Sequence, residues 1–151
     1  MNKEKLLKLA DHMEKSVSQE QYNQNYWFGG EDLVVETIDG VETVVFREGF
    51  CGTAGCIVGH ACAIEAFVED GLRIVKDPSG WQWVPMYKGI TGFDAASLFF
   101  DIPVNHVEVL FGDECSYAAD FYNENFTTQN VAHRLRDYVA NPNIADALVG
   151  F

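Results

Sequence analysis

Positive charge is the scarcest property of this sequence. Its 151 residues carry 10 Lys and Arg against 23 Asp and Glu, so the net charge is −13. A protein that follows nucleic-acid phosphates needs a basic surface, and this composition does not supply one. We therefore expect no direct nucleic-acid binding, and we expect a protein partner to be basic.

Long apolar runs are also missing. No stretch approaches the roughly 20 apolar residues that a membrane-spanning helix requires. The first residues, Met1 to Lys5, are charged and do not resemble the apolar core of a signal peptide. The sequence thus predicts a cytoplasmic protein with no membrane partner.

Cysteine is too rare for a disulfide scaffold in a chain of this length. Three of the four cysteines fall close together on one predicted helix and its approach, where the geometry for pairing is poor. Reduced thiols are the expected state. The four are Cys51, Cys56, Cys62 and Cys115.

Lys and Arg are absent between Lys15 and Arg47, and again between Lys88 and Arg134. These two stretches account for the whole net charge, because acids and bases balance in the rest of the chain. Such a distribution could build an acidic face. The acids are Glu20, Glu31, Asp32, Glu36, Asp39 and Glu42 in the first stretch, and Asp94, Asp101, Glu108, Asp113, Glu114, Asp120 and Glu124 in the second.

Apolar residues, in contrast, make up 48% of the chain, which is enough for the core of one domain over residues 1–151. The periodicity predicts an amphipathic helix over 3–16 and a polar and aromatic loop over 18–30. Asp39-Gly40 between two β-branched runs predicts a hairpin over 33–46. A second hairpin is predicted over 72–84.

A central buried helix is predicted over about 54–68, where small residues would let other elements approach closely. The C-terminal half reads as helical. We expect helices over 94–100, 103–111, 115–123 and 128–140, and a short closing segment over 144–149. The fold class is therefore α+β.

The string from Phe50 to Cys62 suggests three kinds of chemistry. Cys51 at a helix N-terminus could be a nucleophile, with His106 or His133 as its base. Cys56 and His60, four residues apart, could ligate zinc together with Cys51 or Cys115, although the spacing matches no strong zinc signature. The favoured interpretation is packing, with no metal and no cofactor.

Two further patterns have structural and functional interpretations. Residues 95–111 have the outline of a helix-turn-helix, but a DNA-reading helix needs basic residues, so a packed helical corner is expected. Aromatic residues at helical spacing over 117–126 are typical of core or of a contact patch. Trp27, Trp81 and Trp83 leave open a small-ligand site.

The Cys string has the form C-G-T-x-x-C-x-x-G-H/W-A, and it resembles a motif of small uncharacterised phage and mobile-element proteins. Those chains also carry short helices similar to Ala95–Phe100, an x-Leu-Phe turn similar to Leu110-Phe111, and a helix similar to Thr127–Leu135. The resemblance implies that the protein is encoded by a phage or mobile element and acts in a host cell. It implies no particular reaction.

Together these features predict a non-enzymatic protein that binds a basic surface on a host or defence protein, with carboxylates in the positions of phosphates. A thiol hydrolase and a small-ligand sponge remain alternatives. The residues expected to bind the partner are Glu31, Asp32, Asp101, Glu108, Asp113, Glu114, Asp120 and Glu124.

Overall fold

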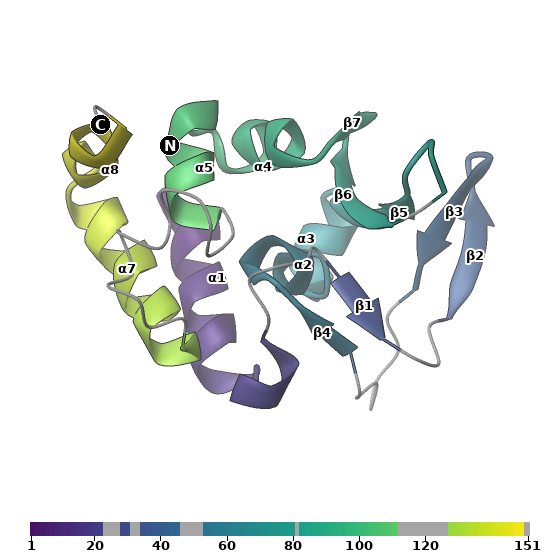
Figure 1. Ribbon diagram of the computed structural model, residues 1–151, viewed down its shortest axis with the longest axis horizontal. Helices are drawn as coiled ribbons and strands as arrows, with labels where there is room; N and C mark the ends of the chain where they lie inside the picture. Colours follow the sequence, from purple (N-terminus) through teal and green to yellow (C-terminus); the bar gives the residue numbers. More distant parts are fainter. Residues whose placement is uncertain (23–27, 31–33, 46–52, 81, 112–126, 150–151) are drawn as a thin grey trace.

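Helices gather on one side of the molecule and strands on the other in the computed structural model (Figure 1). The α+β class is confirmed, with helices in the C-terminal half. The structure describes residues 1–22, 28–30, 34–45, 53–80, 82–111 and 127–149. The predicted helix over 115–123 lies outside these ranges. None of the described helices is long and apolar enough to cross a membrane.

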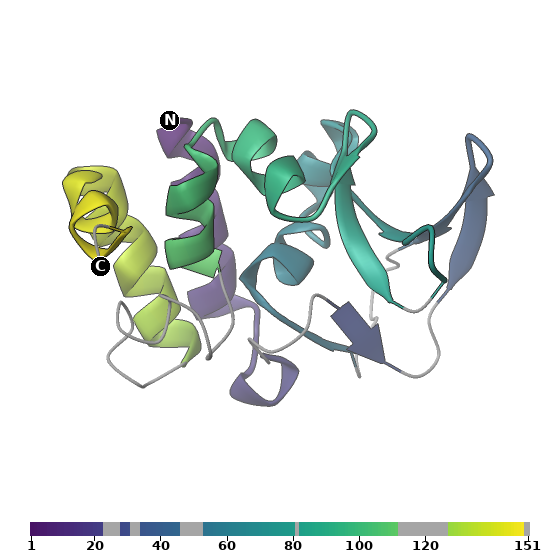
Figure 2. The ribbon, with the colours of Figure 1, turned by 45° about the horizontal axis from the view of Figure 1, so that its top comes forward.

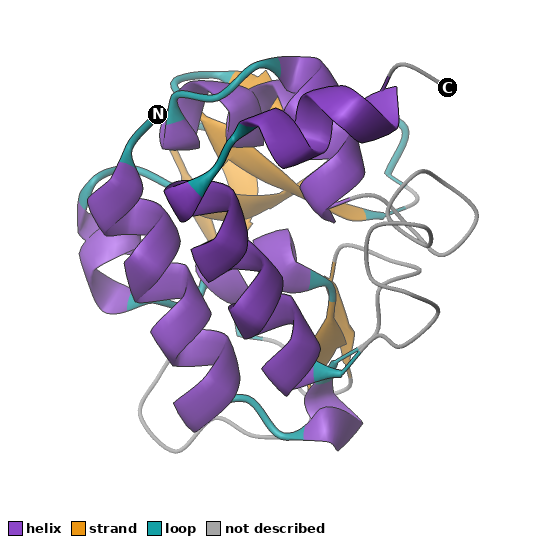
Figure 3. Ribbon diagram, turned by 90° about the vertical axis from the view of Figure 1, so that its left-hand side faces the viewer, coloured by secondary structure: helices purple, strands orange, loops and turns teal. Residues whose placement is uncertain are grey.

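Two antiparallel amphipathic helices of equal length form the centre of the helical part of the molecule. Helix α1 (Lys3–Lys15) begins where the side chain of Asn2 accepts a hydrogen bond from Lys5 N at 3.0 Å. Helix α7 (Thr128–Ala140) begins where Thr127 caps Asn130 N at 3.1 Å. Figures 1 and 3 show the two helices side by side. Both helices were expected from their apolar periodicity.

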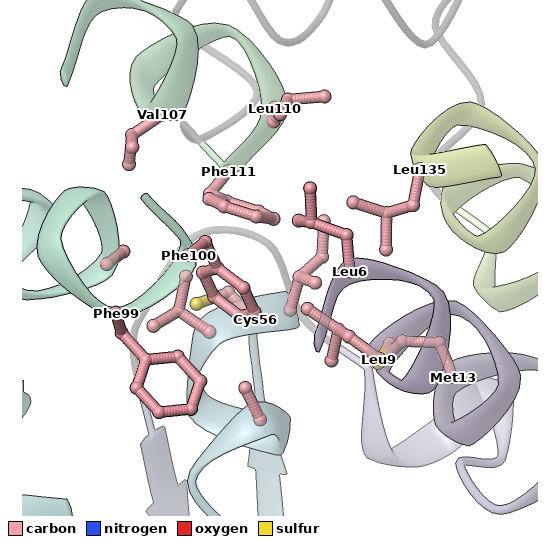
Figure 4. Packing of buried hydrophobic residues seen from close by; sticks show 14 of the residues in the cluster. Leu6, Leu9, Met13, Cys56, Phe99, Phe100, Val107, Leu110, Phe111 and Leu135 are labelled. Carbon is pink, nitrogen blue, oxygen red and sulfur yellow. The ribbon is translucent and has the colours of Figure 1, made fainter. Parts of the chain in front are cut away.

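The apolar stripes of these helices meet in the main core (Figure 4). Leu6, Leu9 and Met13 of α1 lie near Leu135 of α7, and all four are fully buried. Full burial of such a side chain stabilises the fold by about 1.5–3 kcal/mol. The core thus joins the two ends of the chain.

Five strands of the described chain form one antiparallel sheet, in the order β2-β3-β5-β6-β7. Both predicted hairpins, over 33–46 and 72–84, are part of it. A separate antiparallel pair joins β1 to β4. The strands are β1 (Phe28–Gly30), β2 (Val35–Ile38), β3 (Val41–Val44), β4 (Thr53–Gly55), β5 (Arg73–Lys76), β6 (Trp83–Tyr87) and β7 (Ile90–Thr91).

The prediction of one continuous helix over 54–68 is wrong. Its first residues belong to β4, and two short helices follow, α2 (Ile57–Ala61) and α3 (Glu65–Glu69). The break is at Ile64, whose extended backbone (φ −75°, ψ 119°) cannot continue a helix. All five residues of α2 are buried, as the prediction of a central buried element requires.

A tight corner connects α4 (Phe93–Phe100) to α5 (Val104–Phe111), which confirms the packed corner. Asp101 takes the left-handed conformation after α4 (φ 54°), and its backbone N–H bonds to the Ser97 carbonyl. Helix α8 (Asn143–Val149) closes the described chain, and a short 3-10 helix, η1 (Gln19–Gln21), lies in the predicted loop over 18–30.

Aromatic rings link this corner to the core. Phe99 meets Phe67 of α3 and Tyr87 of β6 edge-on, with ring centroids 4.9 and 5.0 Å apart. The Lys5 ammonium lies 3.8 Å from the centre of the Phe99 ring and forms an ion pair with Asp70 at 2.7 Å. Helix α4 is thereby held between α1 and the sheet.

The turn of the first hairpin gives a stability prediction. Asp39 and Gly40 both have positive φ, at 52° and 80°. A Cβ added at Gly40 would meet no atom within 4 Å, so only backbone strain opposes a side chain there. We expect Gly40→Ala to lower the free energy of unfolding by about 1–2 kcal/mol, measured by urea denaturation.

Gly40→Asn is the matched control, because Asn adopts positive φ more readily than Ala. It should lose clearly less stability. Equal losses for the two variants would contradict the assignment of the effect to backbone strain.

Candidate functional site

The two described thiols of the Cys string are buried. Cys56 caps α2, is 2% exposed, and has a pKa raised to about 11 by burial. Burial also raises the pKa of Cys62 well above its usual value, and the charge of Cys56 adds to this effect. The Cys62 thiol donates a hydrogen bond to the Arg73 carbonyl oxygen at 3.6 Å. These surroundings disfavour the thiolate that nucleophilic or metal chemistry requires.

Cys51 and Cys115 lie outside the described residues. The helix expected to begin just after Cys51 begins only at Ile57, so the N-terminal position of α2 belongs to Cys56. Thr53, which precedes α2, is in β4. The prediction that the helix starts directly after Cys51 is therefore wrong, because α2 begins at Ile57.

His60 of α2 is buried next to η1. Its Nε2 lies 2.6 Å from the carbonyl oxygen of Gln21, and because a carbonyl can only accept, Nε2 must carry the proton. His60 thus ties α2 to η1. Within the described part of the chain, no three His, Cys, Asp or Glu side chains group closely enough to hold a metal ion.

His12 of α1 belongs to the same region. Burial, with a smaller contribution from the charge of His60, lowers the pKa of His12 to about 4. The ring is therefore neutral near pH 7. Sequence periodicity places His12 on α1 but gives no sign that it lies near His60, because the two are far apart in the chain.

His106, one of the two candidate bases, is held at both ring nitrogens. Nδ1 lies 2.8 Å from the Tyr138 hydroxyl and Nε2 lies 2.6 Å from a carboxylate oxygen of Asp146. Burial and the charge of Asp146 raise the pKa of Tyr138 to about 12, so its hydroxyl keeps its proton. The hydroxyl can then donate to Nδ1 while Nε2–H donates to Asp146.

This chain of three groups joins α5, α7 and α8. His106 and Tyr138 are 6% and 1% exposed, whereas the side chain of Asp146 is 60% exposed. A substrate cannot reach the two buried members, so the arrangement suits fastening of α8 better than general-base catalysis. The sequence gives no sign of this chain, because Tyr138 and Asp146 lie 32 and 40 residues from His106.

His133, the other candidate base, is 72% exposed on α7 and lies 3.4 Å from Asp137 one turn later. It faces solvent, whereas His106 is buried. The two candidate bases are therefore not members of one site.

The acidic candidates divide between described and undescribed residues. Asp101 and Glu108 are exposed at the α4–α5 corner, as expected of contact residues. Two large apolar side chains at the same corner are also exposed, Leu98 at 43% and Val104 at 42%. The other candidates, Glu31, Asp32, Asp113, Glu114, Asp120 and Glu124, lie outside the described residues.

Several cations of the described chain are already engaged. Arg136 bonds to Asp11 at 2.8 Å and to Glu14 at 2.6 Å. Lys5 pairs with Asp70, and Arg73 lies 3.6 Å from Asp39. The sequence of the α4–α5 corner contains no Lys or Arg, but two cations of α1 and its approach reach it. Lys5 bonds to the Phe99 carbonyl at 3.2 Å, and the terminal ammonium of Met1 pairs with Asp101 at 3.2 Å, which leaves the Asp101 side chain 85% exposed.

The tryptophan site is described only in part. Trp83 is half-buried in β6, with the Lys76 ammonium 4.8 Å from the centre of its ring. Trp27 and Trp81 lie outside the described residues. Of the three tryptophans of the predicted small-ligand site, the structure therefore describes only Trp83.

Comparisons with protein-family models, with curated proteins and with solved structures found no match for this chain. Its function must therefore be argued from its own residues.

Removal of the Tyr138 hydroxyl tests the fastening of α8. Tyr138→Phe leaves the buried Nδ1 of His106 without its donor, and we expect a loss of about 1–3 kcal/mol in the free energy of unfolding. Tyr87→Phe is the control, because the Tyr87 hydroxyl forms no hydrogen bond with the described residues and its ring is similarly buried. Equal losses for the two variants would contradict this role.

The low pKa of His12 predicts an acid-sensitive fold. The pKa of His12 in the folded chain, about 4, lies below its usual value of 6.5, so the unfolded chain binds the proton more tightly. Stability from this group is present above pH 6.5 and is lost as the pH falls toward 4. We expect His12→Gln to flatten that part of the stability profile, measured by denaturant unfolding at a series of pH values.

The control for this prediction is His133→Gln, which removes an exposed histidine. It should leave the profile as steep as that of the unaltered chain. A profile that responds equally to both changes would rule out the buried ring as its cause.

Proposed function

We propose that this chain is a non-enzymatic binding protein of phage or mobile-element type, which recognises a basic surface on a host or defence protein. The observation that carries the proposal is the α4–α5 corner. There Asp101 and Glu108 are exposed together with Leu98 and Val104, in a stretch of sequence without Lys or Arg.

This mixture of side chains suits the chemistry of Lys and Arg. Both have an apolar stem and a charged head, and each part prefers a different surface. The stems can lie on Leu98 and Val104 while the heads reach the carboxylates of Asp101 and Glu108. The corner can therefore bind a basic partner through apolar contacts as well as through charge.

Charge mimicry gives the proposal its mechanism. A groove of Lys and Arg that binds nucleic acid accepts any array of anionic oxygens at suitable spacing, and carboxylates supply such oxygens. Asp94, on the first turn of α4 at the end away from the corner, is a third exposed carboxylate on this helix and its C-terminal approach. Occupation of the groove would exclude its nucleic acid.

The thiol hydrolase alternative has less support. It depends on Cys51, which lies outside the described residues, and on a histidine base. His106 is buried with both nitrogens engaged, and His133 is paired with Asp137 on the solvent side of α7. No described contact brings either one toward the Cys string.

Neutralisation of the corner tests the proposal. The probe is a dye-labelled helical peptide rich in lysine and leucine, and its affinity is measured by fluorescence anisotropy at low and high salt. We expect binding that weakens steeply with salt and falls about three- to tenfold in the double variant Asp101→Asn, Glu108→Gln. Asn suits position 101 because it adopts positive φ readily.

The control double variant Glu20→Gln, Glu42→Gln removes the same charge from exposed positions on η1 and β3. It should change the affinity by less than about twofold. Equal weakening by the two double variants would mean that only overall charge matters, and salt-independent binding would exclude charge mimicry.

A further inference from the structure

We propose that the basic element recognised at the α4–α5 corner is an amphipathic α-helix, which lies lengthwise on α4 and presents a basic, an aliphatic and a basic residue in turn along one face. The inference rests on the proposed function, because it names the form of the partner that binds there. Basic helices are a common means by which proteins contact nucleic acid, so the two proposals fit together.

A single stripe of side chains forms the outer face of α4. Asp94, Leu98 and the C-cap residue Asp101 are exposed, and at about 100° per residue they lie within about 60° of one another around the helix axis. We call these three residues the α4 stripe. The buried residues of the helix lie on its other side and belong to the core: Ala95, Ala96, Phe99 and Phe100.

The α4 stripe is open to a partner. Helix α4 lies along the top of the molecule in Figure 1 and comes forward in Figure 2, and its contacts are with α1, α5, β6 and β7. Leu98 is 43% exposed, and the side chain of Asp101 is 85% exposed although it pairs with the Met1 ammonium. Asp94 is exposed and forms no ion pair with the described residues.

Charge on the stripe selects a basic partner. Two carboxylates flank Leu98, and the sequence from Ile90 to Phe111 contains no Lys or Arg. The Lys5 ammonium reaches α4 at the carbonyl and ring of Phe99, which is on the buried side of the helix. A Lys or Arg at each end of the stripe is therefore complementary, and its aliphatic stem can lie on Leu98.

The spacing of the stripe matches a second helix. At a rise of about 1.5 Å per residue, Leu98 lies about 6 Å beyond Asp94 along the axis, and Asp101 lies about 4.5 Å further. Residues four and three apart on another helix repeat these intervals. Three successive side chains on one face of a strand cover about 13 Å, so an extended peptide fits less well than a helix.

Helix packing brings the matching groups into contact. The axes of two packed helices lie about 8–10 Å apart, so the central aliphatic residue of the partner can contact Leu98 while the basic residues before and after it reach Asp94 and Asp101. Helix α5 is steeply inclined to α4 in Figures 1 and 2, so a partner aligned with α4 passes the corner near Val104. Val104 is 42% exposed and extends the apolar contact.

A second copy of this chain fits the stripe less well. Its helix α1 carries Lys3 and the exposed Leu7 at a suitable interval, but the next residue on that face is Asp11, which would meet a carboxylate. The two copies would also each carry a net charge of −13. The charge therefore favours a basic helix of another protein as the occupant.

The experiment compares two capped, dye-labelled peptides of one composition, each locked as a helix by a staple. The patterned peptide has lysine, leucine and lysine at intervals of four and three residues on the face away from the staple, and the scrambled peptide spreads them around the helix. Affinity for the full chain is measured by fluorescence anisotropy at low salt. We expect the patterned peptide to bind at least about tenfold more tightly.

Matched variants locate the contact. Leu98→Ala should weaken binding of the patterned peptide about three- to tenfold, and Asp94→Asn about two- to fivefold. Leu7→Ala removes a leucine of similar exposure, 40%, from α1, and Glu65→Gln removes an exposed acid from the first turn of α3. Each control should change the affinity by less than about twofold. Circular dichroism checks that every variant is folded.

The outcomes separate this inference from the proposed function. Binding of neither peptide would overturn both. Equal affinity of the two peptides, weakened by Asp101→Asn with Glu108→Gln, would overturn the helical partner alone and keep the basic surface. Equal effects of Asp94→Asn and Glu65→Gln would remove the peptide from the α4 stripe, and a dimer in analytical ultracentrifugation that Leu98→Ala dissociates would assign the stripe to a second copy instead.

Discussion

Packing of α1 against α7 is the constraint on which the rest of the structure depends. It is the most extensive contact between any two described elements, and it buries the apolar faces of both helices. Other elements are then fastened to α1. The backbone N–H of Asn2 bonds to the Phe100 carbonyl at 2.9 Å, and the Lys5 ammonium bonds to the Phe99 carbonyl at 3.2 Å, so the end of α4 is fixed at the start of the chain.

Most of the described cysteine and histidine side chains pack in this framework and are not exposed to solvent. Cys56 and Cys62 fill the core, His60 holds η1, and His106 fastens α8 through Tyr138 and Asp146. Among the exposed charged groups of the described chain, carboxylates are the most numerous, and several aliphatic side chains are exposed as well. This division supports recognition as the function, because burial disfavours the ionised forms that chemistry at a thiol or imidazole requires.

Local signals in the sequence predicted much of the fold and little of the site. Asp39-Gly40 located a hairpin because the turn needs two residues that adopt positive φ, and α1 and α7 follow from periodicity and their caps. Continuous apolar character over 54–68 could not reveal the break at Ile64. The pairing of β1 with β4 and the contacts of His106 with Tyr138 and Asp146 join distant segments, and no local pattern encodes them. Exposure of Asp101 and Glu108 was predictable from their charge.

The contact between α1 and α7 also orders events during synthesis. Helix α1 leaves the ribosome well before the helix that covers its apolar face, which begins only at Thr128. Until then Leu6, Leu9 and Met13 lack their principal cover, although α2 and α4 can already contact α1. A nascent chain truncated before α7 should therefore expose the apolar face of α1 to chaperones, and the native core can close only after α7 has been made.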